Sequence, residues 1–473
     1  MNFVSFSFAA LFAVALLLRL TTKRRSGFFL LALLALSWTF YAWHVPSYLV
    51  LIFVSTLVDY CAARGIEALP PERPRARRLL LLASIGVNVG LLGFFKYAGF
   101  LAETTRHLLG GSDDAFSIPH IVLPIGISFY TFQSMSYTID VYRGKLKAEK
   151  SFLRVATYVA FFPQLVAGPI VRATDFLYQF DRHRSIRARV WSQGAYLVIR
   201  GLFLKVILAD HLGWVVDKHW DRAAGEEAVP GLSLALLVFF AGQLFCDFAG
   251  YSSIARGLAY FLGFRLPVNF DAPYLARSFT EFWRRWHITL SSWMKDYLYI
   301  PFGGNRRGKL RAYCNLFLVM LISGLWHGAA WTFVAWGALH GIAVALERMI
   351  GTNRAERSLW LAAPWAVVVQ LTWILSMGWF RAEGFESGNR MITRALADLS
   401  DLGRTGLYQA FEFADMSLGW FLIAFVAVFH LRAWLAPHVG ESTALEKAAA
   451  AGAMLAAVLS FNVTGQQFIY FQF

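Results

Sequence analysis

His327 stands within an apolar stretch that runs from about Asn315 to Leu346 and reads LISGLWHGAAW around the histidine. About 20 apolar residues suffice to cross a bilayer, and a polar ring in such a segment usually faces a cavity or the protein interior. A neutral imidazole with a pKa of about 6.5 can take a proton from a hydroxyl group at ambient pH. His327 is therefore either a packed core histidine or a group that performs chemistry within a membrane protein.

A second histidine, His287, lies in the hydrophilic segment 264–312, which carries nine Lys and Arg residues against three acids. Ser278 and Glu281 have the spacing of a capping box, and the pattern predicts one helix that ends near Pro301. On a helical wheel His287 falls in an apolar face with Trp283, Trp286, Leu290, Trp293, Met294 and Tyr297. We expect this helix to lie at the cytoplasmic boundary with His287 turned inward.

Residue types and spacing leave two explanations open for this pair, which are packed core histidines or groups that perform chemistry in the interior. A zinc site is not expected, because neither histidine has further ligands at helical spacing. A Ser-His-Asp triad is not expected either, because the sequence has no GxSxG motif and Asp296 faces away from His287 on the wheel. Cys61, Cys246 and Cys314 are too few and too scattered for a disulfide framework.

The composition indicates which class of protein must position these histidines. The chain of 473 residues is 58% hydrophobic and only 15% charged, whereas an ordinary soluble domain is about a quarter charged. We therefore expect an all-α polytopic membrane protein in a lipid bilayer, with no separate soluble domain. The net charge of +15 fits topology signals in cytoplasmic loops. Nucleic acid is not expected as a partner, because no basic stripe alternates with aromatic residues.

The apolar runs predict how the chain crosses the membrane. Candidate spans lie near 3–20, 27–43, 47–61, 79–101, 118–139, 192–214, 231–262, 315–346, 360–380, 417–435 and 447–465. The first run has no basic stretch before it and no cleavage site, which indicates a retained span rather than a signal peptide. Residues 315–346 are too long for one crossing and are predicted to form a hairpin, because both flanking loops are basic.

Several polar or helix-breaking residues lie in apolar surroundings. The stretch 161–176, FFPQLVAGPIVRATDF, is interrupted by two prolines and Gly168, which predicts a re-entrant segment whose freed backbone groups are satisfied by protein or water. Gln164 and Arg172 are expected to fix this backbone rather than bind substrate. Asp247 is expected to anchor helices through buried hydrogen bonds.

Loop charges predict the orientation of the chain. Basic segments lie at 23–25, before Leu79, at 143–150 and at 181–189, whereas 110–116 and 221–228 are acidic. The positive-inside rule then places the N-terminus outside and the basic loops in the cytoplasm. The longest polar loop on the outside, 381–416, could face an extracytoplasmic partner.

Longer blocks of the sequence resemble a known family. NFDAPYLARSFTEFWRRWHITLSSWMKDYLYIPFGGN (269–305) and GLWHGAAWTFVAWGALHG (324–341) are similar to the signature of the membrane-bound O-acyltransferases (MBOAT). The segments 123–144, 161–176 and 245–264, with the FIYFQF ending (468–473), are similar to the bacterial alginate O-acetyltransferase branch. The likeness covers nearly the whole chain.

The resemblance implies one integral-membrane domain over 1–473 with a family-like core at about 118–346. It implies a ring of about 11 transmembrane helices, with re-entrant and interfacial helices, around a tunnel in the bacterial inner membrane. The family's invariant histidine falls on His327 and its second, helix-borne histidine falls on His287, which implies catalytic roles. The same blocks supply the candidate substrate-binding residues Asn269, Trp283, Trp286 and Asp296.

The implied reaction moves an acetyl group from a cytoplasmic donor to an extracytoplasmic, alginate-like polysaccharide. Acetyl-CoA, or another acyl thioester, is the expected donor substrate, and no bound cofactor is expected. His327 is expected to be the general base, whereas His287 polarises the thioester carbonyl or positions a substrate. The immediate acceptor is the polysaccharide or an extracytoplasmic acetyltransferase partner protein that completes the transfer.

Two other functions stay open at this point. Family members that D-alanylate teichoic acid share both histidine positions, so the cargo of a related reaction would be D-alanine for a cell-wall polymer. From a different class, a polysaccharide transporter or exporter would also use two inward histidines and a broken helix. We find no inverted repeat in the sequence, which disfavours the transporter.

Overall fold

The computed structural model describes the chain apart from residues 2, 24–25, 110–120, 182–187, 227–228, 352–358, 401–413, 440–442 and 462–473. Over the described residues the chain is helical and has no β-strand, so the all-α prediction is confirmed. The loop 110–116 and the ending 468–473, which the sequence singled out, lie outside the described residues, as do parts of 181–189, 221–228 and 381–416.

Seven helical stretches among the described residues are long and apolar enough to cross a membrane. They are Pro46–Ala68, Pro74–Leu109, Leu232–Phe261, Lys309–His327, Trp331–Ile350, Ala362–Arg381 and Asp415–Ala436. The apolar helices Phe6–Thr21 and Gly27–Ala42 are shorter. These elements establish a multi-pass helical membrane protein, whereas the ring of about 11 helices around a tunnel stays a prediction.

The described chain divides into two compact units, residues Met1–Val198 with Ser252–Pro267 and residues Ile199–Tyr251 with Val268–Phe473. We call them the first and the second unit. The single domain over 1–473 stays a prediction. Two helices, α10 (Ala188–Leu202) and α12 (Leu232–Phe261), contribute residues to both units.

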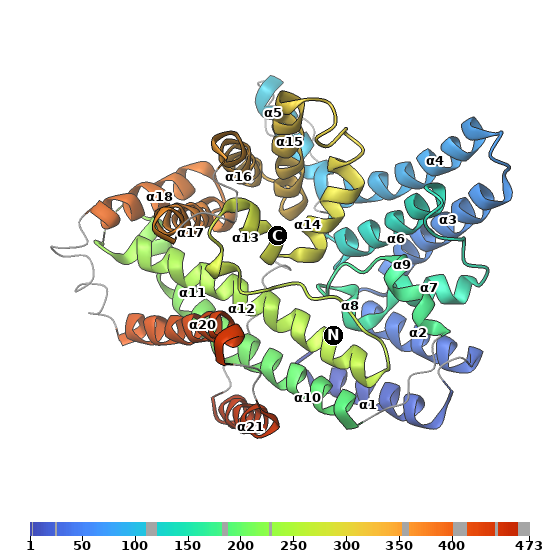
Figure 1. Ribbon diagram of the computed structural model, residues 1–473, viewed down its shortest axis with the longest axis horizontal. Helices are drawn as coiled ribbons and strands as arrows, with labels where there is room; N and C mark the ends of the chain where they lie inside the picture. The colour runs from blue at the N-terminus through green and yellow to red at the C-terminus, as the bar shows by residue number, and fades with distance from the viewer. Residues whose placement is uncertain are drawn as a thin grey trace. The chain divides into compact units, whose positions relative to one another are not determined.

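The first unit is built from the N-terminal helices, coloured blue to green in Figure 1. They are α1 (Phe6–Thr21), α2 (Gly27–Ala42), α3 (Leu49–Ala68), α4 (Pro74–Leu92), α5 (Ala98–Leu109), α6 (Ile127–Tyr142), α7 (Phe152–Ala160), α8 (Phe162–Leu165) and α9 (Ala173–Phe176). A single-turn π-helix, η2 (Gly93–Tyr97), joins α4 to α5, and 3₁₀ turns lie at Pro46–Tyr48 (η1) and Leu177–Phe180 (η3).

A buried carboxylate holds three helices of the first unit together. Asp59 of α3 accepts hydrogen bonds from Ser84 and Asn88 of α4 and from Ser134 and Thr138 of α6. A charged or polar group in an apolar interior is tolerated only when it has such partners. The hydroxyl and amide donors therefore explain how an aspartate can lie fully buried among apolar helices.

The stretch 161–176 is broken as predicted, because only the short helices α8 and α9 form within it. Its surroundings supply the missing backbone partners: Gln164 and Gln133 both donate to the Tyr158 carbonyl, and the Tyr158 hydroxyl donates to the Val171 carbonyl. Gln164 thus fixes backbone, as expected from the sequence, and Arg172 lies half-buried where α9 begins. The position of this segment in the membrane stays a prediction.

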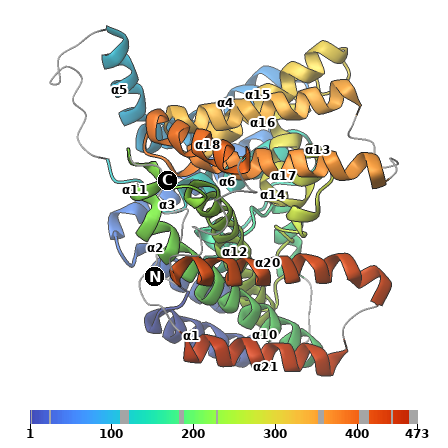
Figure 2. The ribbon, with the colours of Figure 1, turned by 90° about the vertical axis from the view of Figure 1, so that its left-hand side faces the viewer.

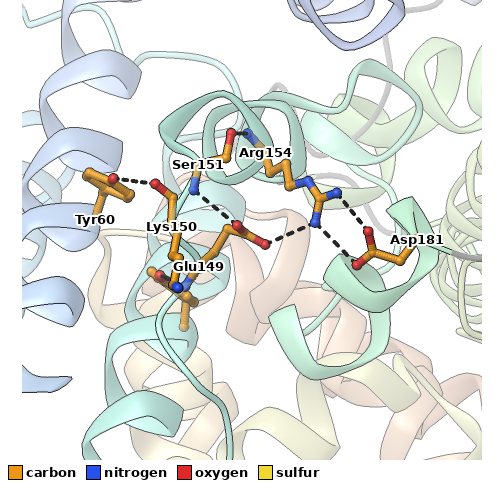
Figure 3. Close-up of polar contacts among 7 residues, drawn as sticks. Tyr60, Glu149, Lys150, Ser151, Arg154 and Asp181 are labelled. Atoms are coloured by element: carbon orange, nitrogen blue, oxygen red, sulfur yellow. Dashed lines mark hydrogen bonds and ion pairs between the residues drawn. The ribbon is translucent and has the colours of Figure 1, made fainter. Parts of the chain in front are cut away.

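The loops on either side of the broken stretch are tied by one arginine. Figure 3 shows Arg154 of α7 reaching Glu149 on one side and both carboxylate oxygens of Asp181 on the other. The Ser151 hydroxyl accepts from the Arg154 backbone N–H, which caps α7, and the Tyr60 hydroxyl donates to the Lys150 carbonyl. These contacts fix the N-terminal end of α7 and tie it to the segment that follows the broken stretch.

The second unit holds the two candidate histidines, His287 and His327. Its elements are the π-helix η4 (Phe203–Ala209), α11 (Asp210–Ala224), the 3₁₀ turn η5 (Pro273–Leu275), α13 (Phe279–Arg285), α14 (Ile288–Met294), the π-helix η6 (Lys295–Tyr299), α15 (Lys309–His327), α16 (Trp331–Ile350), α17 (Leu359–Arg381), α18 (Phe385–Ser400), α20 (Ala414–Val439) and α21 (Ala444–Ser460). Helix α18 lies within the predicted outer loop 381–416 and packs beside α17 (Figure 1).

Residues 315–346 form the predicted hairpin, with α15 and α16 side by side in both views of the ribbon (Figures 1 and 2). The two backbones approach closely because glycines face each other. A Cβ atom on Gly324 would lie 2.3 Å from the Phe333 carbonyl oxygen and 2.9 Å from the Cα atom of Gly337. Small residues of this kind let membrane helices pack tightly. His327 is the last residue of α15, beside the hairpin turn.

A buried ion-pair cluster joins three other elements of the second unit. The Lys205 ammonium of η4 lies 2.7 Å from an oxygen of Asp210 and 2.9 Å from an oxygen of Asp247, on α11 and α12. All three side chains are at most 7% exposed. Asp247 therefore anchors helices, as the sequence predicted, although it does so through an ion pair.

Candidate active site

The prediction of a single helix between Ser278 and Pro301 is wrong, because the chain breaks at His287. Helix α13 ends at Arg285, Trp286 is extended, and α14 begins at Ile288. His287 itself adopts a left-handed backbone with φ of +43°, which costs a residue with a side chain about 1–2 kcal/mol. Ser278 does cap α13, since its hydroxyl accepts from the Glu281 N–H at 3.0 Å. A helical wheel therefore describes α13 and α14 separately, but it does not relate residues of one helix to residues of the other.

Asn269 supplies the reason for the break. Its backbone carbonyl accepts from the Ile288 N–H at 2.9 Å, and the Asp271 N–H donates to the Arg285 carbonyl at 3.0 Å. The extended segment around Asn269 thus pairs with the backbone where α13 and α14 would otherwise join. Strained backbone that persists through contacts of this kind is common at functional sites.

The Asn269 side chain also fixes the histidine ring. Its Oδ1 atom lies 3.1 Å from Nδ1 of His287 and accepts from both the N–H and the hydroxyl of Thr289. An oxygen with two such donors can only accept, so Nδ1 of His287 carries the proton and Nε2 carries the lone pair of the neutral ring. Complete burial lowers the pKa of His287 to about 3, which keeps the ring neutral at physiological pH.

A buried glutamate holds α13 in place. Glu347 of α16 accepts from the N–H groups of Phe279 and Thr280 at 2.6 and 2.8 Å, and from the Thr280 hydroxyl at 2.7 Å. Trp365 of α17 donates to the same carboxylate at 3.0 Å. A carboxylate at a helix N-terminus is stabilised by the unpaired N–H groups and by the helix dipole. The His287 break is thereby anchored to the hairpin that carries His327.

The structure brings the two predicted histidines to one indole ring. His287 is 1% exposed and His327 is 4% exposed. The ring centroid of Trp326 lies 5.8 Å from that of His287 and 5.0 Å from that of His327. Phe248 packs edge-on against His287 at 4.6 Å, and Phe380 lies 5.4 Å from His327. Both imidazoles therefore lie in one dry, aromatic environment.

The other predicted site residues fall into three positions. Asn269 contacts His287 directly. Trp286 is buried against Trp373 at 4.5 Å, and Trp283 meets Trp336 edge-on at 5.7 Å, so both belong to the aromatic wall. Asp296 lies half-buried on η6, nine residues beyond His287 and roughly 13 Å away along the helical path. A role of Asp296 in substrate binding stays a prediction.

A third buried histidine, His340 on α16, escaped the sequence reasoning. Its ring lies 4.7 Å from Trp336, which in turn lies 5.3 Å from His327. The Ser376 hydroxyl donates to the Trp373 carbonyl at 2.7 Å, so it accepts from Nε2 of His340 at 3.2 Å. The spacing of Trp336 and His340, four residues apart on one helix face, was the available signal.

Comparisons with known proteins add sequence relatives to this geometry. The sequence model of the MBOAT, membrane-bound O-acyltransferase family matches residues 146–380, which include both histidines. The probable alginate O-acetylase AlgI of Pseudomonas aeruginosa is 39% identical over 407 residues, 84% of this chain and 75% of the relative. The peptidoglycan O-acetyltransferase of Helicobacter pylori is 37% identical, over 75% of this chain and 71% of the relative. The teichoic acid D-alanyltransferase of Bacillus subtilis is 28% identical over 47% of this chain and 59% of the relative.

Proposed function

Because the chain belongs to the membrane-bound O-acyltransferase family and is an O-acyltransferase, we propose that it moves acetyl groups from a cytoplasmic thioester to an extracytoplasmic polysaccharide. Acetyl-CoA is the proposed donor. The relatives named for O-acetyl transfer match more of the chain, at higher identity, than the relative named for D-alanyl transfer. This difference supports acetyl rather than D-alanine as the cargo, and alginate or a similar glycan as the final acceptor.

The observation that carries the proposal is the pair of buried imidazoles that both contact the Trp326 ring. A hydroxyl oxygen of the acceptor attacks the thioester carbonyl carbon, and the carbon–sulfur bond breaks. The hydroxyl proton passes to His327 and then to the departing thiolate sulfur, so charge and atoms balance. A positioned base contributes about 10²–10⁴-fold to the rate of such a step.

His287 is assigned a positioning role in this scheme. A neutral ring whose Nδ1–H points at Asn269 presents a lone pair at Nε2, so it accepts a hydrogen bond. It therefore suits a substrate hydroxyl better than the thioester carbonyl, which requires a donor. Of the two roles that the sequence left open for His287, this geometry favours positioning a substrate over polarising the thioester carbonyl.

The aromatic lining supports the use of a thioester. The rings of Trp326, Trp336 and Phe380 surround His327 at centroid distances of 5.0 to 5.4 Å. Side chains of this kind exclude bulk water, which would otherwise compete with the acceptor hydroxyl for the acyl group.

We place the enzyme in the bacterial inner membrane, with the N-terminus outside. The basic segment 303–311, which leads into the first turn of α15, then faces the cytoplasm and the phosphates of the donor. Transfer is completed on the glycan itself or through an extracytoplasmic acetyltransferase partner.

Mass spectrometry of surface glycans tests the reaction. A deletion strain should lose O-acetyl groups, and the wild-type gene on a plasmid should restore them, whereas the His327→Ala gene should not. Loss of D-alanyl esters instead would identify the alternative cargo. Unchanged esters in the deletion strain would contradict the proposal.

A further inference from the structure

A second site lies in the same unit, on a face that the acyl-transfer scheme does not use. A cavity of about 450 Å³ is bounded by α12, η5, α17 and α20, and we call it the α20 groove. It is lined by Val238, Ala241, Gly242, Tyr274, Leu275, Gln370, Ile374, Ile423, Val426, Ala427, His430, Leu431 and Trp434. Its volume falls within the roughly 300–1,000 Å³ that ligand pockets usually have.

The lining of the α20 groove is apolar except for a few groups. One of them, His430, is 4% exposed and lines the cavity. Its Nδ1 atom lies 2.8 Å from the Val426 carbonyl oxygen, which can only accept, so Nδ1 is protonated and Nε2 carries the lone pair. Among the residues that the structure describes, Nε2 has no hydrogen-bond partner. A buried acceptor without a partner favours a ligand that brings a donor.

Two other polar groups of the groove, Tyr274 and Gln370, donate to backbone carbonyls. The Tyr274 hydroxyl gives its proton to the Ala241 carbonyl at 2.6 Å. The Gln370 amide nitrogen donates to the Ala276 carbonyl at 3.3 Å, which leaves its oxygen and its second N–H for a group that can both donate and accept, such as a hydroxyl. The groove therefore suits a molecule with a hydroxyl group and a long apolar body.

The helices that line the groove indicate where such a molecule would come from. Helix α12 and parts of α17 and α20 are candidate membrane spans, and Leu431 and Trp434 at the groove are each 50% exposed. A groove between transmembrane helices is open to the lipids that surround the protein. A guanidinium group also lies beside this part of α20, since Arg200 packs over the ring of Phe429, the neighbour of His430, at 5.6 Å.

We propose that the α20 groove binds a glycerolipid with a free hydroxyl group, whose acyl chain fills the apolar cavity and whose hydroxyl donates to Nε2 of His430. Phosphatidylglycerol offers this hydroxyl on an anionic head group near Arg200, and diacylglycerol offers it on a neutral one.

The groove is joined to the histidine site by shared aromatic rings. Tyr274 stacks on His430 at 4.9 Å and lies 6.4 Å from Trp286, the residue before His287. Phe245 bridges the same two rings at 4.9 and 6.3 Å. A lipid in the groove therefore packs behind the wall that supports the His287 break, and its binding should stabilise the second unit.

Native mass spectrometry of the purified full-length protein in detergent tests the proposal without any activity assay. The probes are dioleoylglycerol and its acetate ester, which has the same chains but no hydroxyl. The wild type should bind dioleoylglycerol about tenfold more tightly than the ester, as one hydrogen bond to a buried acceptor allows. The variant His430→Phe should bind both probes alike. His211→Phe is the control, because His211 also contacts a backbone carbonyl but does not line the groove.

A second pair of variants locates the lipid independently of His430. Ala427→Trp fills the groove and should abolish binding of both probes. Ala424→Trp, on the same helix but not in the lining, should leave binding unchanged. Phosphatidylglycerol compared with dioleoylglycerol then distinguishes an anionic source of the hydroxyl from a neutral one. Equal affinity of the wild type for dioleoylglycerol and its ester, or equal losses in the two tryptophan variants, would overturn the proposal.

Discussion

Oδ1 of Asn269 accepts a hydrogen bond from Nδ1 of His287 at 3.1 Å, across 18 residues of sequence. The contact sets the tautomer of the histidine, and the backbone of Asn269 sets the break that aims the ring inward. These contacts suit a positioning residue, whereas substrate binding by Asn269, which the family blocks suggested, stays a prediction.

Replacing Asn269 by Leu should lower transfer by about 10²-fold, because a ring displaced by about 1 Å loses its reactive geometry. Asn269→Asp keeps an oxygen that accepts from Nδ1 and should retain most activity at pH 7.5. Rates with reconstituted protein, at matched amounts of folded enzyme, compare the two. Equal losses in both variants would assign Asn269 to packing alone.

The depressed pKa of His287 predicts a loss of stability in acid. The unfolded chain binds a proton at this residue below about pH 6.5, whereas the folded ring resists protonation down to about pH 3. Above pH 6.5, His287 therefore has no effect on how the free energy of unfolding depends on pH. Below pH 6.5, it lowers the free energy of unfolding by up to about 1.4 kcal/mol for each pH unit. His287→Gln should show a smaller drop in Tm between pH 7 and pH 5 than the wild type. An identical drop would mean that the pKa of His287 is the same in the folded and the unfolded chain.

The Lys205 cluster should respond to the removal of its cation. Lys205→Met leaves the carboxylates of Asp210 and Asp247 buried together, which should destabilise the fold by about 3–5 kcal/mol. Adding Asp210→Asn and Asp247→Asn removes both charges and should restore much of the Tm. Thermal unfolding in detergent measures both changes. A triple variant no more stable than Lys205→Met would show that the ion pairs are not the reason for the loss.

Labelling of single cysteines tests the orientation of the chain in the membrane. The cysteines are introduced in a background without Cys61, Cys246 and Cys314. Arg306 and Asp221 are both exposed in the structure, so cysteines placed there are accessible to reagents. In intact cells a membrane-impermeant maleimide should label Asp221→Cys and not Arg306→Cys, and both should react after permeabilisation. The reverse pattern would put the donor side outside and contradict the proposed direction.

The sequence predicted those features that depend on local pattern. Apolar runs with basic flanks predicted the α15–α16 hairpin, and the Ser278 spacing predicted where α13 begins. Prolines and Gly168 predicted the broken stretch after α7. In each case the residues that determine the structure are close in the chain.

The features that the sequence missed depend on contacts between distant residues. The break at His287 contradicts its own apolar periodicity, and it exists because Asn269 supplies hydrogen bonds to both the ring and the backbone. His340 joins the aromatic wall only because α13 and α17 pack against α16. No pattern within one helix carries that information.

The most direct test of the central claim compares His327→Ala with Arg284→Ala in acetyl transfer. Arg284 is exposed on α13, three residues before the His287 break, so its loss should change the rate little. His327→Ala should reduce transfer from labelled acetyl-CoA by about 10²–10⁴-fold, because the general base is removed. Both proteins should insert and melt like the wild type. Transfer at a normal rate by correctly folded His327→Ala would contradict the account.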